Sequence, residues 1–236
     1  MDARNPRRFG LIALSVFTLS QIAQSGINYF TRGASYFHWA IVTSIATIVL
    51  WYALPFIITY RLEKKDARSL GLAVGREKYI PYTIYAIIGL VSPAFLVGFD
   101  TELAIEFIEQ IVYIGLAEEF FYRGYLLNRF CKWLGDWKGL FLSALLFGLG
   151  HIIARLAENG LRSIVPATQA ATQAFLGGLI FGYMYLRARN IWPSAIAHVS
   201  SNMYIYRIIA LFSVASYRMM KLTCGQILIF SNLSTS

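Results

Sequence analysis

The sequence predicts an all-α protein, a polytopic transmembrane helical bundle of about seven to eight spans. The first observation is composition, because 57% of the 236 residues are hydrophobic and 14% are charged, with a mean hydropathy of +0.55. An average soluble domain is about 25% charged, and a soluble globule of this length could not hide so much apolar surface. The second observation is that the apolar residues fall in long runs. Together these exclude a disordered chain, a collagen-like fibre and a secreted disulfide scaffold.

About seven apolar runs approach the roughly 20 residues that a helix needs to cross the hydrocarbon layer. They lie at 10–30, 38–60, 79–99, 103–127, 138–154, 170–187 and 191–213. We expect a single membrane domain over 1–236, in which 1–100 holds the N-terminal spans and a surface loop. The tail, 214–236, has one short apolar run, and its pattern leaves open whether it helps to form an eighth span.

The first apolar run fits two interpretations. Three arginines precede it and small residues follow it, as in a secretory signal peptide. We expect a retained span instead, because the polar side chains of Gln21, Gln24 and Asn28 suit a helix that packs against other helices.

The excess of positive charge predicts orientation. The 21 Lys and Arg residues exceed the 12 Asp and Glu residues, for a net charge of +9. Most of them gather in short segments between the apolar runs, as the positive-inside rule describes. We therefore expect an integral membrane protein with a cytoplasmic N-terminus and with 61–78, 128–138, Arg187 and Arg189 on that same side. The lipid bilayer is the expected partner, and nucleic acid is not.

Two further features of the chain carry little signal. The segment 61–78 mixes leucines with charges, so it either lies on the membrane surface or forms a solvated loop. Cys131 and Cys224 match no metal or redox spacing, and we expect two separate, inert thiols.

The run 103–127 contains ionisable residues, Glu118, Glu119 and Arg123 among them, which makes it a candidate functional site. Successive helical residues point about 100° apart, and Arg123 lies one turn beyond Glu119, so these two predict an ion pair. Glu118 has no cation on its own helix. A carboxylate buried without a cationic partner holds a proton more readily and can act as a base toward water. Taken alone, the cluster fits structural helix contacts equally well.

Two histidines also fall within apolar runs. His151 lies one helical turn after Phe147, and His198 lies one turn before Asn202 on the same face. A lone buried histidine is more often a packing residue than a catalyst, but two histidines with an aligned asparagine favour a site. Neutral His and Asn both donate hydrogen bonds, as an oxyanion formed by attack on a peptide carbonyl requires.

Three short motifs, in this order on successive helical regions, resemble those of the CPBP family. That family comprises the CAAX prenyl endopeptidases of the Ras-converting type and the bacterial and archaeal Abi, or bacteriocin-processing, relatives. The motifs are Glu118-Glu119-x-x-x-Arg123, Phe147-x-x-x-His151 and His198-x-x-x-Asn202. The resemblance covers about 103–213, which becomes the expected catalytic core, whereas 1–100 carries none of the motifs.

The resemblance implies an intramembrane endopeptidase whose catalytic cavity lies among the helices and opens toward the cytoplasmic leaflet. Its substrate would be a membrane-associated protein or peptide, with prenylated CAAX-type proteins as one class. Carried over by position, Glu118 would activate water with help from His151, Glu119 and Arg123 would orient the site, and His198 and Asn202 would stabilise the oxyanion.

Alternatives remain open for the cofactor and for the function. Glu118, His151 and His198 could form a zinc site with an open position for water. The sequence has no His-Glu-x-x-His motif, however, and Asn202 suits an oxyanion better than a metal, so we favour no cofactor. The same scaffold could also serve a non-cleaving bacteriocin-immunity or binding protein. A transporter with a proton relay is disfavoured because no repeated halves are visible.

Overall fold

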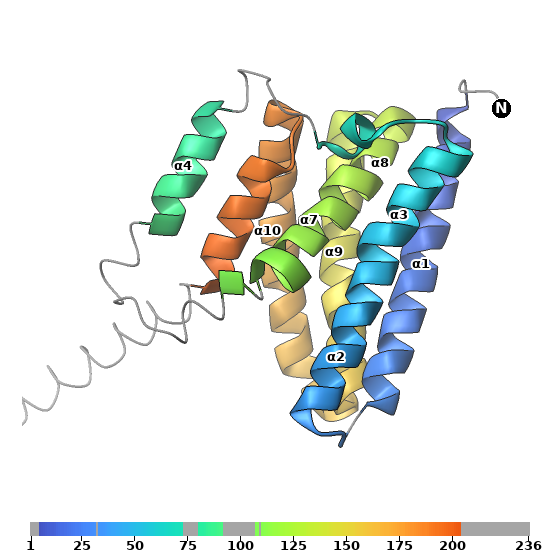
Figure 1. Ribbon diagram of the computed structural model, residues 1–236, viewed down its shortest axis with the longest axis vertical. Helices are drawn as coiled ribbons and strands as arrows, with labels where there is room; N and C mark the ends of the chain where they lie inside the picture. Colours follow the sequence, from blue (N-terminus) through green and yellow to red (C-terminus); the bar gives the residue numbers. More distant parts are fainter. Residues whose placement is uncertain (1–4, 32, 73–79, 92–106, 109, 204–236) are drawn as a thin grey trace, which may run out of the picture.

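The computed structural model describes residues 5–31, 33–72, 80–91, 107–108 and 110–203, and Figure 1 shows long helices lying side by side. These residues contain no strand, which confirms the predicted all-α class. Four of the described helices are long and apolar enough to cross a membrane: Pro6–Phe30, Phe37–Leu62, Asp136–Asn159 and Leu161–Ala188. The chain is an integral membrane protein, and the total of about seven to eight spans stays a prediction.

Helix α1 runs from Pro6 to Phe30 and is the first of these spans. The Asn5 side chain accepts a hydrogen bond from the Arg8 backbone N–H, and a proline follows the cap, so the start has a standard capping arrangement. The helix therefore begins before residue 10, where the apolar run starts. Its 25 residues correspond to about 37 Å, which is enough to cross the hydrocarbon layer.

The second span is a succession of α-helical and wider π-helical turns. It consists of α2 (Tyr36–Thr47), η1 (Ile48–Ala53), α3 (Leu54–Ile57) and η2 (Ile58–Leu62). Pro55 lies in α3, between the two wide segments. Because proline has no N–H to donate and its ring crowds the preceding turn, a helix that contains it is often adjusted locally in this way.

The segment after the second span is anchored to the core. It forms a 3₁₀ turn, η3 (Ala67–Leu70), and the Leu70 side chain is fully buried. A side chain at Gly124 would collide with the Leu70 carbonyl oxygen, so only glycine allows this approach. The Asn128 side chain also donates to the Ser69 carbonyl at 2.7 Å. The described part of 61–78 is thus neither a free loop nor a segment resting only on the membrane surface.

The rest of the described chain contains a short helix, a broken central helix and a long hairpin. Its elements are α4 (Ile80–Val91), η5 (Gln110–Ile114), α7 (Gly115–Glu119), η6 (Phe120–Leu127), α8 (Asn128–Leu134), α9 (Asp136–Asn159), η7 (Leu161–Ser163), α10 (Ile164–Ala188) and the helical residues 192–203.

Helices α9 and α10 both extend past the apolar runs predicted at 138–154 and 170–187, because Gly135 and Gly160, with φ of 85° and 70°, mark where the chain turns. Parts of the predicted runs 79–99, 103–127 and 191–213 lie outside the described residues.

The core is centred on η6, whose residues are all buried. In Figure 1 the continuous helical segment from α7 to α8 passes through the middle of the bundle, with α1, α3, α9 and α10 around it. A helix that is buried on all sides carries its polar residues into the interior, where they require partners. This placement puts Glu118, Glu119 and Arg123 at the centre of the protein.

The basic segments meet at one end of the bundle, the end that carries the N-terminus in Figure 1. There the Lys65 ammonium lies 4.5 Å from the centre of the Phe9 ring, and Arg189 pairs with Asp136 at 3.0 Å. The prediction that these segments share a side is confirmed for the described residues. That this side is cytoplasmic stays a prediction.

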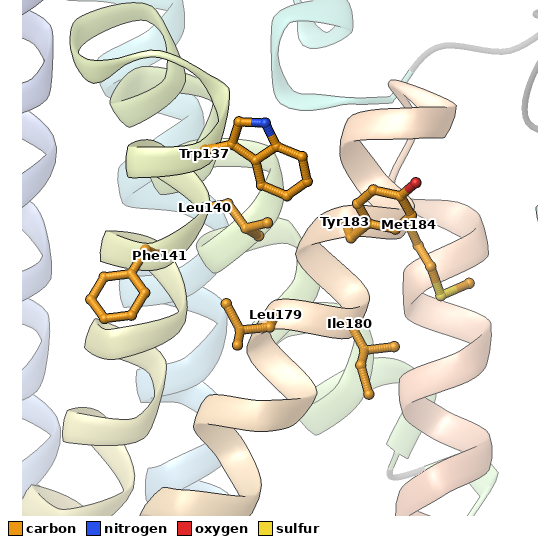
Figure 2. A pocket seen from close by; sticks show the side chains of 7 residues that line it. All are labelled: Trp137, Leu140, Phe141, Leu179, Ile180, Tyr183 and Met184. Atoms are coloured by element: carbon orange, nitrogen blue, oxygen red, sulfur yellow. The ribbon is translucent and has the colours of Figure 1, made fainter.

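The outer face of the α9 and α10 pair is apolar and holds a groove of about 460 Å³. Figure 2 shows the side chains that line it: Trp137, Leu140, Phe141, Leu179, Ile180, Tyr183 and Met184. The rings of Trp137 and Tyr183 stack with their centroids 6.3 Å apart. Tryptophan and tyrosine gather where helices meet the membrane interface. We interpret this groove as part of the lipid-facing surface.

Candidate active site

The glutamate pair lies at the end of α7, with Glu118 8% and Glu119 0% exposed. One turn later, a guanidinium nitrogen of Arg123 lies 3.0 Å from Glu119 Oε1, which confirms the predicted ion pair. The Arg123 guanidinium also lies over the Phe147 ring, 4.5 Å from its centre. An aromatic face attracts a cation and shields it from lipid. Arg123 is therefore held between a carboxylate and an aromatic ring.

His198 joins the two glutamates, although they point in different directions from their helix. Its Nδ1 lies 3.0 Å from Glu119 Oε1, and its Nε2 lies 3.5 Å from Glu118 Oε2. The ring stacks on Phe181 of α10 with the centroids 4.8 Å apart. Glu118 thus has no cation on its own helix, as the sequence indicated, but it has an ionisable partner from the last described helix.

The two contacts of His198 restrict where its ring hydrogens can lie. A carboxylate oxygen only accepts hydrogen bonds, so His198 Nδ1 carries the hydrogen that points to Glu119. In a neutral ring, Nε2 would then direct a lone pair at a Glu118 oxygen, which is unfavourable unless one partner is protonated. When the imidazole holds that proton, two carboxylates face two cations, Arg123 and His198. Such a balanced group is less costly in an apolar core than an unpaired charge.

His151 is half-buried on α9, with Nδ1 2.9 Å from the Phe147 carbonyl oxygen. Because a carbonyl only accepts, the hydrogen is on Nδ1, and Nε2 of the neutral ring keeps its lone pair. The Phe147 ring contacts both His151 and His198 edge-on, at 4.8 and 5.8 Å between centroids. No hydrogen bond or ion pair connects His151 to Glu118, and both lie within the described part of the chain.

Asn202 has a partner that the sequence did not indicate. Its amide nitrogen donates to Gln110 Oε1 at 2.8 Å, and Gln110 begins η5, the segment that leads into α7. An amide nitrogen has two hydrogens, so one stays available for a ligand. The only signal for Gln110 was a polar amide inside the apolar run 103–127, a weak signal because amides also join helices in membranes.

Small residues explain how these helices come close enough. A Cβ on Gly115 would lie 2.7 Å from a Val199 methyl group, so glycine at this position lets α7 approach the helix of His198. Ser194, at the start of that helix, donates its hydroxyl hydrogen to the Ile191 carbonyl oxygen at 3.0 Å and so helps to fix the turn where the helix begins. Close helix packing through small residues is common in membranes. It positions His198 between the two glutamates.

The residues proposed as zinc ligands do not converge in this structure. Glu118 and His198 are adjacent, but His151 is not part of the same group. Among the described residues, no set of three or more His, Cys, Asp and Glu side chains is placed to hold a metal ion. The cavity open toward the cytoplasmic leaflet stays a prediction, since 92–106 and 204–236 lie outside the described residues.

Comparison with known proteins supports the resemblance noted from the sequence. Residues 100–204 match the family model described as type II CAAX prenyl endopeptidase Rce1-like. This range includes all six candidate site residues. No curated protein and no solved structure matches the chain.

Proposed function

Because residues 100–204 carry a domain of the type II CAAX prenyl endopeptidase Rce1-like family, we propose that this protein hydrolyses a peptide bond of a membrane-associated protein or peptide by using water activated by Glu118. Prenylated CAAX-type proteins are the first substrate class to test. The family match supports a CAAX-type intramembrane protease in general. The observation that carries the specific proposal is the His198 ring between Glu118 and Glu119 in the core of the bundle.

In the proposed reaction, Glu118 takes a proton from water as the water oxygen attacks the carbonyl carbon of the peptide bond. The carbonyl oxygen becomes an oxyanion. When the bond between carbon and nitrogen breaks, Glu118 returns the proton to the leaving nitrogen, which departs as an amine and leaves a carboxylic acid. One carboxylate serves as base and then as acid, so no other reactant is needed.

The remaining residues have distinct proposed roles. Protonated His198 donates from Nε2, and Asn202 offers the amide hydrogen that Gln110 leaves available, so both can stabilise the oxyanion. Glu119 and Arg123 are positioning residues, since Glu119 fixes the other ring nitrogen of His198. His151 presents Nε2 as an acceptor that can orient the attacking water.

The test is to replace Glu118 and follow proteolysis. We expect Glu118→Gln and Glu118→Ala to be folded and membrane-inserted, and to cleave at least about 100-fold more slowly, the lower end of the effect of a general base. Asp136→Asn is the matched control, because the Asp136 side chain is half-exposed and forms a surface ion pair with Arg189. New peptide termini in membrane proteomes of cells expressing the wild type, but not Glu118→Ala, would identify substrates. Wild-type cleavage by purified Glu118→Ala would refute the assigned base.

Two further measurements address the alternatives. Activity that is lost with a chelator and restored by zinc would replace the proposed metal-independent mechanism. Protection against a bacteriocin that survives loss of both Glu118 and His198 would indicate a binding protein instead of a protease. No specific contact in the structure favours the second alternative.

A further inference from the structure

The inward face of α1 is polar over its second half. Gln21, Gln24 and Asn28 follow helical spacing on one face, and Gln21 and Asn28 are buried. Burying amides in a membrane protein is costly unless they find hydrogen-bond partners. Gln24 Nε2 donates to Asn28 Oδ1 at 3.2 Å, and Asn28 Nδ2 donates to Glu158 Oε1 of α9 at 3.1 Å. Three polar side chains thus form a continuous hydrogen-bonded row.

This row lines a cavity of about 600 Å³ between α1, α2, the end of α9 and the end of η5. It lies in the part of the bundle away from the N-terminus, where Figure 1 shows α1, α2 and α9 side by side. We call it the vestibule. Its polar lining consists of Gln24, Asn28, Thr43, Ser44, Thr47 and Glu158, whereas the larger part of its lining is apolar. Its volume is many times the roughly 30 Å³ that one water molecule occupies.

The vestibule also contains hydrogen-bonding capacity that the described protein groups leave unused. Gln24 Oε1 is buried and has no partner among the described residues. Water is held where a roomy cavity offers polar partners, and in the vestibule these partners lie along the row from Gln24 to Glu158. The Glu158 carboxylate at its outer end adds an ionisable group that requires solvation beyond its bond to Asn28.

Residues next to the vestibule lead from its lining toward Glu118, which does not itself line it. Ile114 lines it and ends η5, one helical turn before Glu118. One turn before Gln24 on α1, Gln21 donates to the Tyr122 hydroxyl at 3.2 Å. Tyr122 follows Glu118 by four residues, about one helical turn. A side chain at Gly150 would lie 2.7 Å from the Tyr122 hydroxyl, so glycine there leaves room for this contact.

We propose that the vestibule is a water-filled channel that brings water to Glu118 from the end of the bundle opposite the N-terminus. Its purpose rests on the proposed hydrolysis, which consumes one water per bond. Its existence does not, because the polar row, the cavity volume and the contact to Tyr122 are independent of the reaction. A protease in an apolar core needs such a supply, since lipid holds almost no water.

The test uses cysteine labelling by a charged, water-soluble methanethiosulfonate reagent, on full-length protein in lipid vesicles. The background carries Cys131→Ser and Cys224→Ser. Into it we introduce Gln24→Cys in the vestibule or, as the matched control, Ile22→Cys. Ile22 is 64% exposed on the outer face of α1 and differs from Gln24 in depth by only about 3 Å.

We expect Gln24→Cys to react at least about tenfold faster than Ile22→Cys, because only a thiol in contact with water forms the reactive thiolate. Equal rates, whether both slow or both fast, would overturn the proposal, since the cavity would then give no specific access to water. Comparing reagent added outside with reagent sealed inside the vesicles should show that access comes from the side opposite the N-terminus. Access from the N-terminal side would refute the stated direction.

The labelling does not depend on proteolysis, so its outcome is separate from that of the Glu118 experiment. Fast labelling of Gln24→Cys in a protein that cleaves no substrate would support the vestibule and refute the proposed endopeptidase activity. Active cleavage with no difference in labelling would refute the vestibule alone. Thr47→Phe, which fills the cavity without touching Glu118, is a second variant. We expect it to slow Gln24→Cys labelling by about tenfold in the combined variant, and an unchanged rate would contradict the proposal.

Discussion

The contact between Gln110 and Asn202 makes a quantitative prediction for catalysis. Removing it with Gln110→Leu takes away one hydrogen bond of 2.8 Å, worth about 0.5–1.5 kcal/mol. If this hydrogen bond orients Asn202 toward the oxyanion, its loss raises the activation free energy by that amount, which lowers kcat roughly two- to tenfold. Asn202→Ala removes the oxyanion donor itself and should cost about 10²–10³ in kcat. KM should change little in either variant, because the contact acts in the transition state.

The decisive measurement is a double-mutant cycle on cleavage of one peptide substrate by purified protein in vesicles. If Gln110 acts only through Asn202, the double variant is no slower than Asn202→Ala alone. Multiplicative losses in the double variant would refute the reasoning and give Gln110 an independent role. Val112→Ala serves as the control, because Val112 lies on the same η5 segment with an exposed side chain. It should leave kcat unchanged.

Two predictions concern stability, measured as thermal unfolding in detergent. Gly124→Ala should lower the free energy of unfolding by about 1–3 kcal/mol, because the new methyl group meets the Leu70 carbonyl oxygen, part of the backbone. Gly26→Ala, with no neighbour within 4 Å, should be neutral or stabilising by up to about 1 kcal/mol, and equal losses in both would contradict this account. Arg123→Met should cost about 3–5 kcal/mol, since it leaves Glu119 without its arginine, whereas Arg123→Met with Glu119→Met should recover part of that loss. If the double variant is no more stable than Arg123→Met, the loss in Arg123→Met does not come from the unpaired Glu119 carboxylate.

The sequence predicted the class of fold and one contact of the site, for physical reasons. Apolar runs of membrane length predict helices, because lipid offers no hydrogen-bond partners and an α-helix pairs its own backbone N–H and C=O groups. The pair between Glu119 and Arg123 follows from helix geometry alone, as the two residues are one turn apart. Likewise, the same-end placement of the basic segments followed from their position between spans.

Contacts between helices could not be predicted in this way. The spacing of residues 118 and 119 says that the carboxylates diverge, but not that one imidazole from residue 198 reaches both. Nor does local sequence show that Leu70 is buried against Gly124, because the charges around Leu70 are typical of a loop. These contacts depend on which helices approach closely, and that is decided by small residues such as Gly115 together with their partners far along the chain.

The two adjacent glutamates differ chemically because their partners differ. Glu119 Oε1 receives both the Arg123 guanidinium and His198 Nδ1, and its side chain is fully hidden. The ion pair and the hydrogen bond commit Glu119 to holding Arg123 and His198 in place. The Glu118 side chain is 11% exposed and meets only the more distant His198 nitrogen at 3.5 Å, so water can approach it. Glu118 is therefore the carboxylate that we expect to accept a proton from water. The single variants Glu118→Gln and Glu119→Gln should therefore differ in their defects. Glu118→Gln should lose turnover while its stability is unchanged. Glu119→Gln should lose both turnover and stability, because His198 then has no anion to hold its Nδ1 hydrogen.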